Sequence, residues 1–98
     1  AYYGIPRAEL LSHEGGVVRF KVFDGLEERG AWAKPFKIYQ ELITVRLGGR
    51  VVPHEYDAKT GTISVKHDLP PGTHEAVVTL VNLHKNHSLP KRVRVEVK

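Results

Sequence analysis

RVRVEV (Arg92 to Val97) alternates charged residues with valines without a break. Successive side chains of a β-strand point to opposite faces, so this segment has one apolar face and one charged face. The same period of two recurs in residues 18–22 (VRFKV), 43–47 (ITVRL), 63–66 (ISVK) and 76–80 (AVVTL). This alternation predicts antiparallel sheets that bury one face and expose the other to water.

Glycine and proline residues fall between these segments at the spacing expected of short strands. Gly15-Gly16, Gly48-Gly49 and Pro70-Pro71-Gly72 are residue types that favour tight turns. Gly48-Gly49 predicts a hairpin between the runs on either side. We therefore expect about seven strands, at roughly residues 6–12, 16–24, 41–48, 50–56, 62–67, 73–82 and 90–97.

The apolar sides of these strands are expected to meet face to face in one core. His74 shares the inward phase of its strand, and we expect one of its ring nitrogens to bond to a backbone carbonyl at the core edge. The expected inward apolar residues are Leu10, Val18, Phe20, Val22, Ile43, Val45, Leu47, Ile63, Val65, Leu69, Ala76, Val78, Leu80, Val93, Val95 and Val97.

The chain has 98 residues, which is enough for one domain (residues 1–98) and too few for two. It has no cysteine, which excludes disulfides, Cys-ligated zinc and a Cys nucleophile. No apolar run approaches the roughly 20 residues needed to span a bilayer, so no membrane insertion is expected. The start of the chain has neither a signal-peptide pattern nor a Met, and we expect the domain to be a fragment of a larger protein.

The net charge of +4 raises the question of an anionic partner. The basic residues are dispersed, and several alternate with apolar ones as the solvent face of a strand does. This pattern favours a solvated sheet face over nucleic-acid binding. Binding of an anionic polymer through the basic tail, residues 91–98, is a further hypothesis.

Three groups of carboxylates were considered for acid–base chemistry: Glu27-Glu28, Glu55 with Asp57, and Glu9 with Glu14. Each is bracketed by Lys, Arg or turn residues, as solvated side chains are. No serine has the G-x-S-x-G context of a nucleophile elbow, and neither glycine pair precedes a helix that would bind phosphate. We expect no catalytic residues in this domain, although the parent protein could be an enzyme.

The six histidines raise a metal hypothesis, and only His84 and His87 are closely spaced. Zinc sites use three or four ligands at defined spacing, and no third ligand is evident here. We expect exposed loop histidines, no metal site and no cofactor, with His84 and His87 as the weak candidates.

Residues 25–40 (GLEERGAWAKPFKIYQ) form a connection longer than most loops, and they include the one Trp of the sequence. Trp32, Phe36 and Tyr39 lie in this segment, and Tyr2 and Tyr3 lie at the start of the chain. Such aromatic side chains can close the end of a core, contact a neighbouring domain or protein, or stack on sugar rings. They are the candidate binding residues.

A family resemblance is carried by several stretches of the chain. Residues 43–52 (ITVRLGGRVV) have a strand, small turn, strand pattern, and residues 56–63 (YDAKTGTI) a following turn and strand. Residues 69–78 (LPPGTHEAVV) contain a Leu, Pro-Gly, His entry to a long strand. Together with residues 5–24, these stretches resemble bacterial immunoglobulin-like and fibronectin-III-like modules.

The resemblance implies an all-β, immunoglobulin-like antiparallel β-sandwich of about seven strands. It further implies a non-catalytic accessory, interaction or spacer module of a secreted or cell-surface multidomain protein, whose partners are neighbouring domains or another protein. The alternative is a carbohydrate-binding module that uses the aromatic residues around Trp32, with a polysaccharide as partner. Asn82 stands where the family frequently has Asp, and Lys85-Asn86 stands where it has Gly-Asn, so a calcium site is not carried over.

Overall fold

The computed structural model describes residues 5–23, 38–83 and 85–98. In these residues the chain forms strands and one short 3-10 helix, η2 (Gln40–Leu42). The strands are β1 (Arg7–Glu14), β2 (Val17–Phe23), β3 (Thr44–Leu47), β4 (Arg50–Val51), β5 (Glu55–Asp57), β6 (Thr62–Lys66), β7 (Gly72–Thr79) and β8 (Lys91–Val97).

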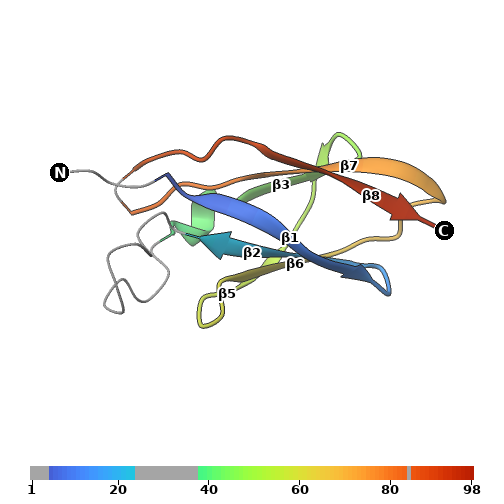
Figure 1. Ribbon diagram of the computed structural model, residues 1–98, viewed down its shortest axis with the longest axis horizontal. Coiled ribbons are helices and arrows are strands. Elements are labelled where there is room, and N and C mark those ends of the chain that lie inside the picture. Colours follow the sequence, from blue (N-terminus) through green and yellow to red (C-terminus); the bar gives the residue numbers. More distant parts are fainter. Residues whose placement is uncertain (1–4, 24–37, 84) are drawn as a thin grey trace.

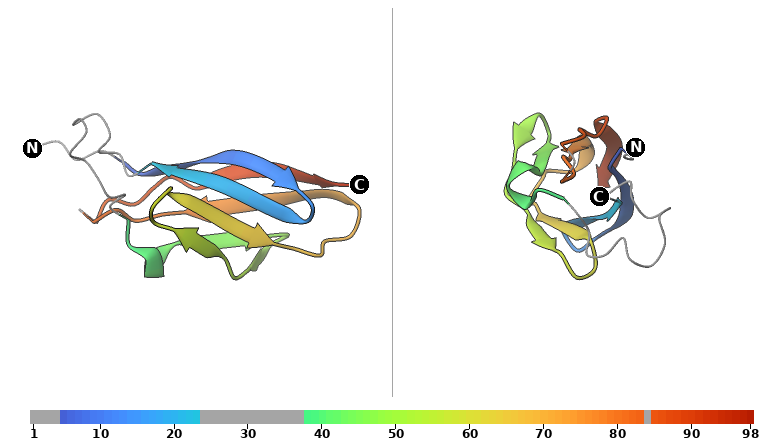
Figure 2. Two further views of the ribbon diagram at one scale, coloured as in Figure 1. Left: turned by 90° about the horizontal axis from the view of Figure 1, so that it is seen from below. Right: turned by 90° about the vertical axis from the view of Figure 1, so that its left-hand side faces the viewer.

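The strands form two four-stranded antiparallel sheets, with orders β1-β2-β6-β5 and β4-β3-β7-β8. The sheets lie one above the other as two layers (Figures 1 and 2). This arrangement is immunoglobulin-like: one sheet contains β1, β2, β5 and β6, and the facing sheet contains β3, β4, β7 and β8. The predicted all-β sandwich is therefore confirmed, with eight strands instead of about seven.

The extra strand arises because the expected strand 50–56 is two strands in different sheets. Val52 donates its backbone N–H to the Val45 carbonyl at 2.9 Å, beside the edge of β3. Pro53 and His54 belong to no strand. The chain crosses to the opposite sheet, where Glu55 pairs with Ser64 on β6. The prediction of one continuous strand was wrong, since a proline within an alternating run argues against such a strand.

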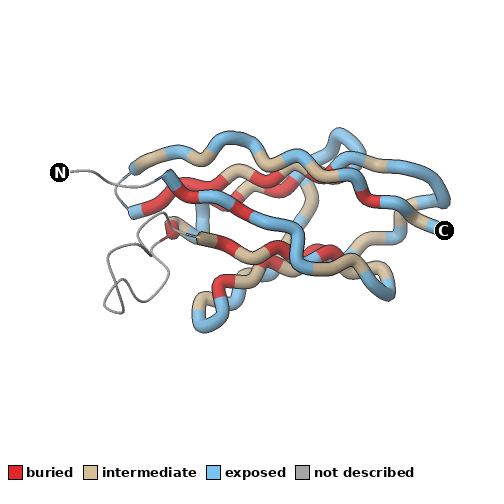
Figure 3. The backbone as a smooth tube through the Cα atoms, viewed as in Figure 1, coloured by how far each residue is buried: buried red, intermediate tan, exposed pale blue. Residues whose placement is uncertain are grey.

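In the described residues, the core lies between the sheets and is made of aliphatic side chains around Phe20. Phe20 and Ile63, which face each other across β2 and β6, are fully buried. Figure 3 shows buried and exposed positions alternating along the strands. All residues of the expected inward set except Leu10 are buried or pack against the core.

Leu10 is the correction to that set, because it is 42% exposed. Its register partner is the buried Phe20, so its phase is inward, but β1 is the edge strand of its sheet. The register then shifts between Leu10 and Ser12, which leaves Leu11 as an extra, exposed residue. Such a bulge bends an edge strand. The buried residue of β1 is Ala8, and not Leu10 as expected from the sequence.

The sandwich is elongated, with principal extents of 46 × 21 × 20 Å. The strands run along the long axis, and β1 and β8 point in the same direction (Figures 1 and 2). As a result, β1 begins at one end of the long axis and the chain leaves at the other. Among the described residues, no helix is both long enough and apolar enough to cross a membrane.

Candidate functional site

The aromatic binding residues expected from the sequence fall mostly on residues that the structure does not describe. Tyr2, Tyr3, Trp32 and Phe36 lie outside the described ranges. Tyr39 is described, is partly buried, and precedes η2. Its backbone N–H donates to the Val81 carbonyl at 2.9 Å, which fixes the chain beside β7. The aromatic binding site therefore stays a prediction.

The two weak metal candidates are not brought together by the described structure. His84 lies outside the described residues, and His87 is an exposed residue that forms an isolated bridge with Val81. Within residues 5–23, 38–83 and 85–98, no group of three His, Asp or Glu side chains is arranged to hold a metal ion.

Asn82, at the position where the resemblance has Asp, closes a turn. Its side chain is completely buried, and Oδ1 accepts the Asn86 N–H at 3.0 Å. The Asn82 backbone N–H donates to the Asn86 carbonyl, also at 3.0 Å. Beyond this turn, the Ser88 hydroxyl accepts the Leu80 N–H at 2.7 Å. These bonds satisfy backbone groups that would otherwise be buried without a partner.

Lys85 lies in this turn with a positive φ of 64°. An L-residue with a side chain pays roughly 1–2 kcal/mol for the left-handed region, whereas glycine does not. Glycine also costs more conformational entropy on folding, so the expected net gain for Lys85→Gly is smaller. We expect this variant to raise the free energy of unfolding by about 0.5–1 kcal/mol in urea denaturation. A loss of stability would contradict the backbone conformation described here.

His74 behaves as the sequence predicted. It pairs with the buried Val95 and lies on the inward side of β7. Its Nε2 lies 2.8 Å from the Pro70 carbonyl oxygen, so the ring nitrogen bonds to a backbone carbonyl at the turn that enters β7. The prediction for His74 is confirmed, and its role there is to hold the Pro70-Pro71-Gly72 corner.

A pair of histidines that sequence reasoning missed forms the candidate site. His13 lies on β1 and His67 directly follows β6, 54 residues away. Their Nε2 atoms are 2.9 Å apart and their ring centroids 5.1 Å apart. β2 lies between β1 and β6 in the sheet. The segment after β6 approaches the β1–β2 turn closely, because the His67 N–H donates to the Gly16 carbonyl at 2.9 Å. This approach brings the two rings together.

The close approach of this turn explains the residue at position 16. Gly16 has a φ of 74°, and a Cβ added there would lie 3.2 Å from the His67 carbonyl oxygen. A side chain at Gly16 would therefore be strained by the backbone and would push against the segment that holds His67. The pair Gly15-Gly16, which the sequence predicts to form a tight turn, therefore also helps to position the histidine pair.

The protonation of His67 is constrained by its second ring nitrogen. Nδ1 of His67 accepts the Leu69 backbone N–H at 3.3 Å, and a nitrogen that accepts carries no proton. Burial lowers the pKa of His67 below its usual 6.5, and nearby His13 and His74 lower it further, while Asp68 acts in the opposite direction. The neutral ring is therefore the favoured form.

An open hollow of about 440 Å³ lies beside the histidine pair. Because its lining includes Glu96, Val97 and Lys98, it lies where β8 ends. C marks that end of the chain in Figure 1. Its lining combines the β1–β2 turn, the segment after β6 and the end of β8: His13, Glu14, Gly15, Gly16, His67, Asp68, Leu69, Glu96, Val97 and Lys98.

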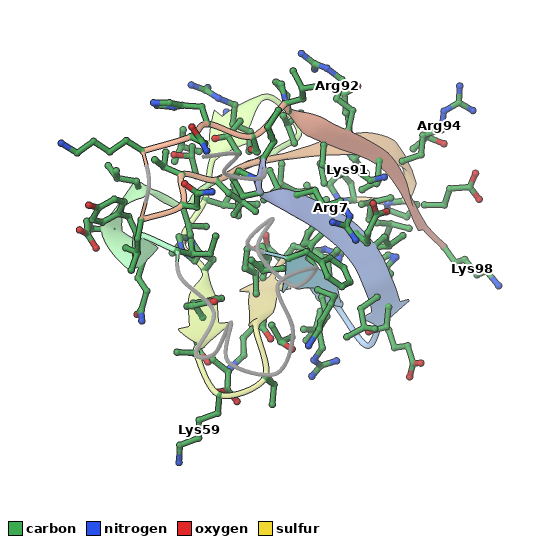
Figure 4. The ribbon with its side chains drawn as sticks, turned by 60° about the vertical axis from the view of Figure 1, so that its left-hand side comes forward. Arg7, Lys59, Lys91, Arg92, Arg94 and Lys98 are labelled. Atoms are coloured by element: carbon green, nitrogen blue, oxygen red, sulfur yellow. The ribbon has the colours of Figure 1, made fainter. Side chains whose placement is uncertain are left out.

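The basic side chains of β8 make contacts with neighbouring strands. Lys91 bonds to Glu9 at 3.0 Å and Arg92 to Glu75 at 3.1 Å. Figure 4 shows Arg92 and Arg94 projecting outward from β8. Arg7, on β1, lies over the Phe23 ring, 4.2 Å from its centroid. Exposed pairs of this kind contribute about 0–1 kcal/mol each and accord with a solvated, mixed-charge sheet face.

The carboxylates considered for acid–base chemistry lie at exposed positions where the structure describes them. Asp57 Oδ1 accepts the Lys59 N–H at 2.9 Å and stabilises the turn between β5 and β6. Glu9 and Glu75 are in the ion pairs of β8, and Glu27 and Glu28 lie outside the described residues.

Comparison of the chain with protein-family models, curated proteins and solved structures finds no match.

Proposed function

We propose that this domain is a non-catalytic spacer and interaction module of a larger secreted or cell-surface protein. The observation that supports the proposal is the path of the chain. It enters β1 at one end of a body 46 Å long and leaves after β8 at the other end. A module with this path sets a fixed distance between whatever adjoins its two ends.

The direction of the strands supports a load-bearing role for such a module. A force along the long axis acts parallel to the strands, so it loads many backbone hydrogen bonds of the β1–β2 and β7–β8 ladders together. The first and last strands lie in different sheets, and the Lys91–Glu9 pair connects them. Moving one past the other also requires exposing the aliphatic core between the sheets.

The roles of the described polar side chains favour a module without bond-making chemistry. Asn82, Asp57, His74 and Ser88 each bond to a backbone group in a turn or connection. Each of these side chains provides a hydrogen-bond partner for a backbone N–H or carbonyl group. The neighbouring domains of the parent protein are the proposed partners.

Force spectroscopy on the complete chain tests the spacer role. The sequence has no cysteine, so attachment points can be introduced as Ile5→Cys, just before β1, with Lys98→Cys, just after β8. We expect a single cooperative unfolding event at high force, because the strands are loaded in shear.

The matched control moves one attachment point, using Glu14→Cys with Lys98→Cys. Both residues line the hollow at one end, so the force pulls the hairpin away from β8 and breaks contacts in succession. This pair is expected to unfold at a clearly lower force at the same loading rate. Equal unfolding forces for the two pairs would refute a load-bearing spacer.

A further inference from the structure

The His13–His67 pair adds a side-chain contact between two parts of the domain that one backbone bond, from His67 to Gly16, also joins. His13 is on β1, next to the end of the edge strand. His67 is on the segment between β6 and β7, which leads to the opposite sheet. The 2.9 Å contact between the two Nε2 atoms therefore joins the edge strand to the crossing segment.

The hydrogen bonds around the pair fix where its protons lie. Because His67 Nδ1 accepts the Leu69 N–H, the proton of a neutral His67 is on Nε2. That Nε2–H donates to Nε2 of His13, which must therefore carry no proton. A neutral His13 consequently carries its proton on Nδ1. The arrangement is complete with both rings neutral, and it assigns one tautomer to each ring.

An added proton breaks this arrangement at whichever ring receives it. Protonated His67 has an Nδ1–H facing the Leu69 N–H, so that bond is lost, whereas its Nε2–H still donates to His13. Protonated His13 has an Nε2–H facing the Nε2–H of His67, so the contact between the rings is lost. The same geometry argues against a metal ion bound by both Nε2 atoms, because a ligated, neutral His67 would also carry its proton on Nδ1.

The charged groups around the pair come from every element packed there. Glu14 lies at the end of β1, Asp68 follows His67, His74 lies on β7, and Glu96 and Lys98 lie at the end of β8. Asp68 favours protonation of His67, while His13 and His74 oppose it. Burial also opposes it, and the net effect on the pKa of His67 is a decrease from 6.5.

We propose that the His13–His67 pair is an acid-released latch at the end of the domain from which the chain leaves. At neutral pH the latch holds the crossing segment, residues 67–71, against the β1–β2 hairpin. A proton on His67 first costs the Leu69 bond, and protonation of both rings then parts them. Each step adds positive charge to the hollow lined by residues 96–98 and loosens this end of the sandwich. In a spacer, the joint with a neighbour at this end would change with pH; the latch itself does not depend on the spacer role.

The sign of the pH dependence follows from the lowered pKa of His67. The unfolded chain binds the proton more readily than the folded one, so stability rises with pH across this range. The contribution is fully present above the unfolded pKa of 6.5 and is lost as the pH falls through the lower, folded pKa. Acid therefore weakens the hold of the histidine pair on this end of the sandwich.

Nuclear magnetic resonance of the complete chain tests the latch. At pH 7.5 we expect long-range proton–nitrogen spectra to show His67 with its proton on Nε2 and His13 with its proton on Nδ1. On titration towards pH 5, the ring of His67 is expected to titrate below 6.5, and the Leu69 amide resonance to shift with the same midpoint. A proton on Nδ1 of His67 at pH 7.5 would overturn the proposal, whatever the variants show.

Two variants separate the latch from a general effect of acid. His13→Phe keeps a ring but removes the acceptor and the partner charge, so the His67 midpoint is expected to rise towards 6.5. His87→Phe removes an exposed histidine from the β7–β8 connection and is expected to leave that midpoint unchanged. An unchanged midpoint in His13→Phe would show that the two rings are not coupled. If His13→Phe does not fold, the tautomers of His13 and His67 in the wild-type chain at pH 7.5 still test the proposal.

Discussion

Replacing Phe20 by alanine is expected to lower the free energy of unfolding by about 3–5 kcal/mol. Phe20 is fully buried on β2, an inner strand of its sheet, and it is the one aromatic residue of the buried core in the part of the chain that the structure describes. Removing its ring leaves a cavity that the two opposed sheets cannot fill without breaking their ladders. Domains of this size are stable by roughly 5–15 kcal/mol, so the variant loses a large share of the total.

Urea denaturation followed by circular dichroism measures this loss. Phe23→Ala is the matched control, because Phe23 lies on the same strand with its partly exposed ring beneath Arg7. Loss of that cation–π contact is expected to cost about 1 kcal/mol. Similar losses in the two variants would mean that β2 does not have one buried and one exposed face.

Replacing Asn82 by alanine is expected to cost about 1–3 kcal/mol, which is a large effect for a residue outside the strands. The substitution removes the oxygen that accepts the Asn86 N–H and leaves a space in a fully buried position. The turn that connects β7 to β8 then loses its side-chain bond and keeps only backbone bonds, such as that from Asn82 N–H to the Asn86 carbonyl. This loss adds to the strain already present at Lys85, whose φ is positive.

The control for Asn82→Ala is Leu83→Ala, in the same turn. Leu83 is 45% exposed, and its truncation is expected to change stability by less than about 0.5 kcal/mol. Both variants are compared by thermal unfolding under the same conditions. If Asn82→Ala proves as mild as Leu83→Ala, the buried amide does not hold the turn.

The period of two in the sequence was sufficient to predict the faces of the strands. Val18, Phe20 and Val22 are buried on β2, and Val45 and Leu47 are buried on β3, as their alternation indicated. The strand break at Pro53 was also visible in principle, because a proline within an alternating run argues against a continuous strand. The exposure of Leu10 was not predictable, since it depends on which strand lies at the edge of the sheet.

The candidate site shows why local pattern predicts some contacts and misses others. The bond between His74 and Pro70 spans four residues, so the turn residues and the strand phase were enough to predict it. The contact between His13 and His67 spans 54 residues and depends on the order of β1, β2 and β6. Two isolated histidines carry no spacing signal, and only the register of the strands brings them together.

The chain crosses between the two sheets at residues 52–54, and the two sheets enclose one core. Nuclear Overhauser effects across residues 50–57 detect this crossing. We expect contacts of Val51 with Arg46 and of Glu55 with Ser64, and contacts of the Phe20 ring with core methyl groups of both sheets. A continuous strand over residues 50–56 that pairs with a single neighbour would contradict this crossing.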